Sequence, residues 1–143
     1  MGKSVLAAVL LVLALGLVGC SSNPVAVGIP PMPSSPAAPS VIIVSASSAK
    51  TYLYQETVTM NLQNNGGAGY FKVRAYCLSR TPGQPMEMTD ESEAFDVIAG
   101  WKDTMTWVAY TGYGGTETSI KRLVVLCRAP SSTEWVETST YNL

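Results

Sequence analysis

The sequence feature that most constrains the fold is a period-two alternation of apolar and polar residues that recurs from residue 41 to the end of the chain. In its clearest run, Val58, Met60 and Leu62 alternate with polar residues, and only Glu56 interrupts the apolar side. Such alternation is typical of a β-strand with one buried face. Seven runs of this kind, separated by turn residues and without a helical period, predict an all-β fold, a seven-stranded β-sandwich. We expect strands at residues 41–44, 54–62, 71–77, 95–97, 105–109, 123–127 and 134–138.

The turn between the second and third runs is unusually rich in glycine. Residues 64–69 contain two asparagines and three glycines, a composition that favours a turn with positive φ angles. A phosphate-binding loop is a poor match, because no Gly-Lys-Ser/Thr follows and a strand rather than a helix comes next.

The first twenty residues have the pattern of an export signal. Lys3 precedes an uncharged apolar run of 14 residues, 5–18, which is shorter than the about 20 residues needed to span a bilayer. The run ends in Leu17-Val18-Gly19-Cys20 and resembles the lipobox of bacterial lipoprotein signal peptides. The resemblance implies a signal peptide at 1–19 that is cleaved, and a mature chain held on the membrane by lipid, palmitate included, at Cys20. The alternative is an ordinary secretory signal.

The residue after the cysteine is Ser21 rather than aspartate. In a bacterium with two membranes, the lipoprotein resemblance therefore implies sorting to the outer membrane. In a bacterium with one membrane it implies the outer face of the cell membrane. We accordingly expect a location in the bacterial cell envelope.

A proline-rich segment separates the signal from the alternating runs. Residues 21–40 contain six of the nine prolines of the chain and no charged residue. Such a segment buries too little apolar surface to fold, so we expect residues 20–40 to be a lipidated cysteine followed by a disordered tether, and 41–143 to be the folded domain. A proline-rich ligand motif at residues 30–33 is the alternative.

Charge and residue usage narrow the possible chemistry. Without residues 1–19 the chain has eight basic and ten acidic side chains, a balance that argues against nucleic acid as a partner. Histidine is absent, which excludes Ser-His-Asp and Cys-His catalysis, and we expect no metal, no cofactor and no enzymatic activity. The acidic residues between 87 and 96 are predicted to form a solvated loop, with a calcium site as the alternative. A hydrolase would need Asp96 and Asp103 to converge in one pocket.

The three cysteines divide into one candidate for lipidation and a pair in the domain. Cys77 and Cys127 both lie on the apolar phase of their predicted strands. An even pair in an exported protein favours a disulfide, so we expect a Cys77–Cys127 bridge. Two buried thiols that never meet are the alternative.

Exposed aromatic residues are the candidate binding residues. Tyr70 and Tyr76 share the outward phase of one strand with Lys72 and Arg74, while Trp101 and Tyr113 fall in turns. Aromatic and basic side chains together can stack on sugars or bind a protein partner. The alternative is that they pair across strands and stabilise only the sheet surface.

The stretch from Val58 to Tyr76 is similar to the core of immunoglobulin-like and fibronectin-III-like envelope domains, the group that includes the CARDB and FxLYD domains. In those families an alternating strand runs into an Asn-x-Gly turn and then into a strand with an inward valine. Ala99-Gly100, followed by a strand with Thr104, Thr106 and Trp107, resembles their second turn. The resemblance implies an immunoglobulin-like sandwich and a non-catalytic adhesion or interaction role, and it supplies no site residues.

These observations together predict a lipid-anchored binding module for an envelope protein or a cell-wall glycan. The alternative function is that of a structural or assembly accessory subunit within a larger envelope complex.

Overall fold

The computed structural model describes residues 37–79, 81–112 and 119–143, and all of its regular elements are strands. Among these described residues no helix is long and apolar enough to cross a membrane. The eight strands are β1 (Val41–Tyr52), β2 (Gln55–Asn64), β3 (Gly69–Cys77), β4 (Glu87–Glu91), β5 (Phe95–Val97), β6 (Lys102–Tyr110), β7 (Ile120–Arg128) and β8 (Val136–Asn142).

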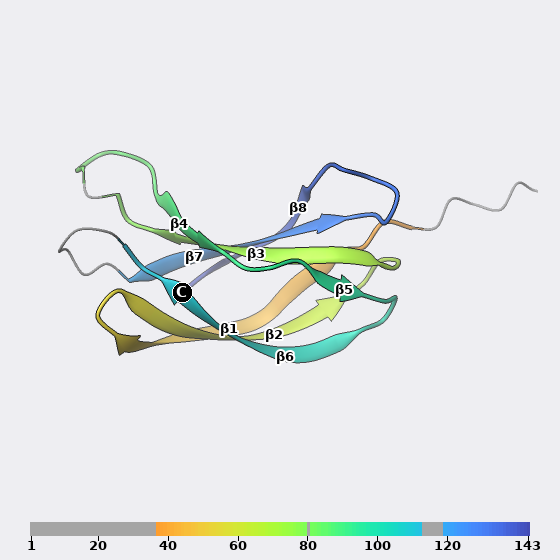
Figure 1. Ribbon diagram of the computed structural model, residues 1–143, viewed down its shortest axis with the longest axis horizontal. Helices are drawn as coiled ribbons and strands as arrows, with labels where there is room; N and C mark the ends of the chain where they lie inside the picture. The colour runs from red at the N-terminus through yellow and green to blue at the C-terminus, as the bar shows by residue number, and fades with distance from the viewer. Residues whose placement is uncertain (1–36, 80, 113–118) are drawn as a thin grey trace, which may run out of the picture. The chain divides into compact units, whose positions relative to one another are not determined.

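The strands form two antiparallel sheets that pack face to face (Figure 1). One sheet has the order β1-β2-β6. The other has the order β4-β3-β7-β8, and β5 pairs with β3 beyond the end of β4. Two antiparallel sheets packed on each other form a β-sandwich, so the predicted all-β sandwich class is confirmed.

The predicted strand count was one too low, because β4 was expected to be part of an acidic loop. Glu91 pairs with Arg74 and Glu87 pairs with Cys77, and this pairing turns the acidic segment into an edge strand. The polar residues of β4 lie at the edge of the sheet, where charged side chains protect against pairing with another chain. β1 is also longer than expected, since its polar second half continues to pair with β2.

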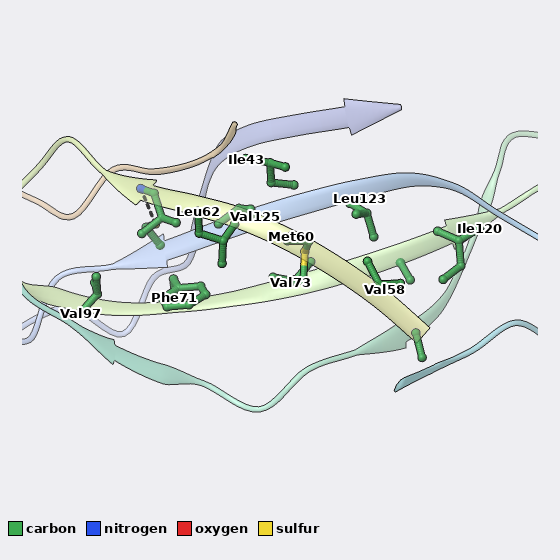
Figure 2. Close-up of a cluster of buried hydrophobic side chains, with 14 of the residues drawn as sticks. Ile43, Val58, Met60, Leu62, Phe71, Val73, Val97, Ile120, Leu123 and Val125 are labelled. Carbon is green, nitrogen blue, oxygen red and sulfur yellow. Dashed lines mark hydrogen bonds between the residues drawn. The ribbon is translucent and has the colours of Figure 1, made fainter. Parts of the chain in front are cut away.

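The core consists of the inward residues of both sheets. Figure 2 shows Val58, Met60 and Leu62 of β2 packed against Phe71 and Val73 of β3, with residues of β7 in the same layer. All five of these side chains are at most 2% exposed. The period-two alternation of the sequence therefore identified the buried face correctly.

Glu56 is the one acidic residue on the inward phase of β2, and it is only 2% exposed. Its Oε2 accepts a hydrogen bond of 3.3 Å from the Ile120 N–H in the opposite sheet. A buried carboxyl group needs a hydrogen-bond donor. Glu56, which interrupts the apolar face of β2, therefore links the two sheets through this bond.

The predicted Cys77–Cys127 disulfide is wrong, because both cysteines are free and buried. They do lie on neighbouring strands, β3 and β7, and both face inward. In the antiparallel register, however, Cys77 is opposite Ile120 while Cys127 is opposite Phe71. Six residues separate the two positions along the strand, roughly 20 Å at 3.3 Å per residue, whereas a disulfide needs Cα atoms within about 7 Å. The alternative of two buried thiols that never meet is the correct one.

Glycine is required in the turn at residues 64–69 for a reason other than the positive φ angles that the sequence suggested. Residues 64–69 contain none of the positive φ angles, which occur at Tyr54, Gly83, Gly100 and Gly112 among the described residues. A Cβ atom on Gly66 would instead lie 2.2 Å from the Ala38 carbonyl oxygen, and one on Gly67 would lie 1.8 Å from that of Ala37. These glycines are needed because the chain that enters β1 passes directly against the turn.

Asn64 holds this region together. Its Oδ1 accepts hydrogen bonds from the Ser40 and Gly66 N–H groups, at 2.9 and 3.0 Å. Its Nδ2 donates to the carbonyl oxygens of Gly67 and Ile98, at 2.7 and 2.8 Å. One buried amide thus joins the entry segment, the glycine turn and the β5–β6 turn.

Candidate functional site

The outer face of the five-stranded sheet carries four of the predicted binding residues. Along β3, buried and half-buried positions alternate, and the half-buried set consists of Tyr70, Lys72, Arg74 and Tyr76. The predicted phase of this strand is therefore confirmed, and the four side chains share one face. We call this face, together with the residues of β4, β7 and β8 that contact it, the outer face.

The two tyrosines each lie against an arginine of the neighbouring strand. Tyr70 pairs with Arg128 and Tyr76 with Arg122 in the β3–β7 register. The guanidinium carbons lie 4.7 and 4.9 Å from the respective ring centroids. Such cation–π contacts contribute about 0.5–1 kcal/mol at exposed sites. They are the cross-strand pairs that the alternative interpretation expected, and they also hold the rings in place for a partner.

The two basic residues between the tyrosines converge on one carboxylate. Lys72 Nζ lies 2.7 Å from Glu91 Oε1, and Arg74 Nε lies 2.5 Å from Glu91 Oε2. Partial burial raises the pKa of the Glu91 carboxyl, but the hydrogen bonds from Lys72 and Arg74 outweigh it and bring that pKa below its ordinary value. The same hydrogen bond to Glu91 raises the pKa of Arg74. The charged forms of Glu91 and Arg74 are thus favoured, and the two ion pairs hold all three side chains together.

Trp135 completes the outer face, and the sequence did not point to it. The Lys72 ammonium lies 4.6 Å from its ring centroid and the Arg128 guanidinium 5.1 Å. The alternation of β7 did contain a signal for the arginines, since Arg122 and Arg128 lie on the opposite phase from Leu123 and Cys127. The position of Trp135 in the connection before β8 has no local pattern, so only the fold could place it.

Arg122 and Arg128 retain hydrogen-bonding capacity. Among the described residues, the Nε atom of each is buried and has no hydrogen-bond partner. The Arg128 Nη1 donates to the Ser132 carbonyl oxygen at 3.1 Å. Buried polar atoms are usually paired, so these two Nε atoms are exceptions within the described residues.

Val124 and Leu126 occupy the outer phase of β7 between the two arginines but are only 5% and 7% exposed. Arg74 pairs with Val124 and Lys72 pairs with Leu126 in the β3–β7 register. Their aliphatic stems therefore lie beside the two apolar side chains and shield them from water. The outer face consequently presents charge and aromatic rings rather than an open apolar surface.

The remaining candidates lie elsewhere. Trp101 lies at the turn between β5 and β6, as expected, but it is only partly exposed. Its ring is partly buried against the core, 5.4 Å from the Phe71 centroid. An indole next to a buried phenyl ring gains more by packing than by exposure to water. Cys20 and Tyr113 lie outside the described residues, so the lipidation and the binding role predicted for them stay predictions.

The acidic residues of β4 are engaged in structural contacts. Asp90 Oδ2 accepts a hydrogen bond of 2.9 Å from the Tyr110 N–H of β6, and Glu87 accepts one from the Ser79 hydroxyl. Across residues 37–79, 81–112 and 119–143, no three His, Cys, Asp or Glu side chains are grouped so that they could hold a metal ion. The predicted solvated loop is thus replaced by an ordered edge strand.

Asp96 and Asp103 line the same hollow, which was the condition for a carboxylate hydrolase. Their strand positions, however, direct the side chains differently. Asp96 pairs with Tyr70 of the outer face, whereas Asp103 shares the inward phase of β6 with Met105. Successive side chains of a strand point to opposite faces, so the two aspartates reach the hollow from different phases of their strands.

No family model matches the chain, and no curated protein matches it in sequence. Three solved β-glucosidases show a partial structural likeness. They are DesR from Streptomyces venezuelae in complex with D-glucose (TM-score 0.41, 17% identity), EmGH1 from Erythrobacter marinus (0.40, 17%) and the GH3 β-glucosidase of Bifidobacterium adolescentis (0.40, 14%). Each match covers 73% of this chain, which spans only 15–17% of those proteins. At these TM-scores the likeness carries no inference about activity.

Proposed function

We propose that this protein is a non-catalytic binding module, anchored by lipid at Cys20 to the bacterial envelope, whose outer face contacts an envelope protein or a cell-wall glycan. The observation that carries the proposal is the concentration of Tyr, Trp and Arg side chains on one face of one sheet. These three residue types are the ones enriched where binding energy is concentrated in protein interfaces. The envelope location rests on the resemblance of residues 17–20 to a lipobox.

The charge of the outer face favours an acidic partner. Lys72, Arg74, Arg122 and Arg128 all contribute to it, and Glu91 offsets one of the charges of the first two. Within the described residues Arg122 and Arg128 form no ion pair, so they are the side chains best suited to bind a carboxylate or phosphate group. We therefore expect the partner to present such groups, and we expect the interaction to weaken as salt is raised.

The test is a crosslinked pull-down from whole envelopes with the full-length protein as bait. The variant bait carries Tyr70→Ala, Tyr76→Ala, Arg122→Ala and Arg128→Ala. A matched control carries Thr59→Ala and Thr106→Ala on the outward side of the three-stranded sheet, where the two threonines pair with each other. We expect a partner that is recovered with the wild type and the control and is lost with the variant. Identical partners with all three baits would contradict the proposal.

Size fractionation after gentle solubilisation addresses the accessory-subunit alternative. A binding module is expected to be recovered partly as free protein. If the protein migrates only with a large assembly, it is an obligatory subunit and the outer face is part of a permanent interface.

A further inference from the structure

A second site of different chemistry lies at the edge of the sandwich, where β5 and β6 belong to opposite sheets. It is a hollow of about 220 Å³. Its lining includes the rings of Phe71, Phe95 and Trp101, together with Met105 and Asp103. None of its lining residues is basic. Its chemistry is therefore apolar and acidic, in contrast to the basic outer face.

The three rings form a row. Phe71 lies in the middle, with its centroid 5.4 Å from that of Phe95 and 5.4 Å from that of Trp101. The rings are tilted by 31° and 41° relative to Phe71, so they stand closer to stacked than to perpendicular. Phe71 is 1% exposed, whereas Phe95 is 36% exposed and Trp101 is partly exposed. The accessible rings of the row are thus those of Phe95 and Trp101.

Backbone hydrogen bonds hold Trp101 in place. Its N–H donates to the Ile98 carbonyl at 3.3 Å across a turn in which Gly100 has a φ of 73°. Asn64 clamps both ends of this turn. Its backbone N–H donates to the Trp101 carbonyl at 2.8 Å, and its side chain donates to Ile98. A ring that is already fixed loses little conformational entropy when a ligand binds.

Asp103 is one of three polar residues that line the hollow, together with Asp96 and Thr104. One carboxylate oxygen of Asp103 accepts the Thr104 N–H at 2.7 Å, which orients the group. Within the described part of the chain, the other oxygen has no hydrogen-bond partner. It is free to accept hydrogen bonds from hydroxyl groups of a ligand.

We propose that this hollow binds a neutral saccharide. A pyranose ring has one face of C–H groups, which suits the accessible aromatic ring of Phe95 or Trp101, and an edge of hydroxyl groups, which suits the carboxylate of Asp103. The negative charge of the hollow disfavours uronic acids and sugar phosphates by like-charge repulsion. An ammonium ligand is less well matched, because it is best held when rings surround it, whereas these rings lie in a row. The site is separate from the outer face and does not depend on it.

The test is a titration of ¹⁵N-labelled full-length protein, followed by NMR, with two neutral sugars, cellobiose and N,N′-diacetylchitobiose. The readout is the Trp101 indole N–H signal, assigned with a Trp101→Phe variant. We expect this signal to shift with a Kd of about 1 mM, an affinity typical of a small contact surface. The Trp135 signal on the outer face is expected to stay in place, and glucuronic acid is expected to shift neither.

Three variants make the result specific. Phe95→Ala and Asp103→Ala should each weaken binding by about tenfold or more, since each removes one of the two contacts. Tyr110→Ala removes a 53% exposed ring outside the hollow and should leave binding unchanged. The melting temperature of each variant shows whether it is folded. Absence of a Trp101 shift with either neutral sugar, equal binding by the folded Asp103→Ala variant, or a shift with tetramethylammonium alone would overturn the proposal.

Discussion

Asn64 shows how much one side chain contributes to this fold. Four hydrogen bonds from a single amide use its full donor capacity and both lone pairs of its oxygen. The partners are all backbone groups, and they belong to the entry segment, the glycine turn and the β5–β6 turn. The sequence marked this asparagine only as a turn residue, because its partners lie as far as 34 residues away.

Replacing Asn64 with alanine should therefore be strongly destabilising. We expect Asn64→Ala to lower the free energy of unfolding by about 3 kcal/mol, because it removes a buried side chain and leaves two partly buried N–H groups and two carbonyls without this partner. Asn65→Ala is the matched control, since Asn65 is an exposed neighbour, and it should change stability by less than about 0.5 kcal/mol. Urea denaturation of both variants measures the difference, and similar midpoints would contradict the role given to Asn64.

Glu91 makes stability depend on pH. Its folded pKa lies below the ordinary value of 4.5, so the folded state holds the charged form more strongly than the unfolded chain does. Its contribution is therefore complete above pH 4.5 and is lost as the pH falls through the folded pKa. We expect the wild type to be more stable than Glu91→Gln by about 1 kcal/mol or less at pH 7, and this difference to shrink towards pH 3. A difference that grows on acidification would be the opposite of this prediction.

At the scale of the element, β3 and β7 are the two strands that contribute both to the core and to the outer face. Their inward residues build the core, and their outward residues build the outer face. Their register also decides the state of the cysteines. Alternation alone predicted that both thiols face inward, which is correct, but it contains no information on which residue of β7 faces which residue of β3.

The register leads to a clear expectation for Cys77 and Cys127. We expect both thiols to react with a maleimide after denaturation without reductant, as peptide mapping by mass spectrometry would show. We also expect the melting temperature to be the same with and without reductant, because no covalent bond is removed. A mapped Cys77–Cys127 peptide pair would overturn the register of these two strands.

At the scale of the whole molecule, the sheets are joined along an edge as well as through the core. The Thr138 hydroxyl donates to the Val41 carbonyl at 2.8 Å, and the Val41 N–H donates to the Cys127 sulfur at 3.3 Å. These bonds fix the first residue of β1 to the opposite sheet. A domain with its first strand fastened in this way is suited to presentation on a tether.

Membrane attachment is the prediction that belongs to this scale. Cys20→Ala should release the protein from the membrane fraction, because stable attachment needs acyl chains that each contribute about 0.8 kcal/mol per buried methylene. Cys77→Ala is the matched control, since it removes a domain thiol and should leave attachment unchanged. Fractionation followed by immunoblotting compares the two, and membrane-bound Cys20→Ala would exclude the lipoprotein proposal.

The sequence by itself determined the strands, their buried phases and the shared outward side of Tyr70, Lys72, Arg74 and Tyr76, because alternation is a local property of each strand. Tertiary structure alone decided which strands became neighbours and in what register. It thereby excluded the disulfide, made β4 a strand, placed Trp135 over Lys72 and put Trp101 beside Phe71. It also explained the glycine turn, whose constraint comes from a backbone some 28 residues earlier in the chain. Such contacts depend on long-range pairing, and no pattern within a single segment records them.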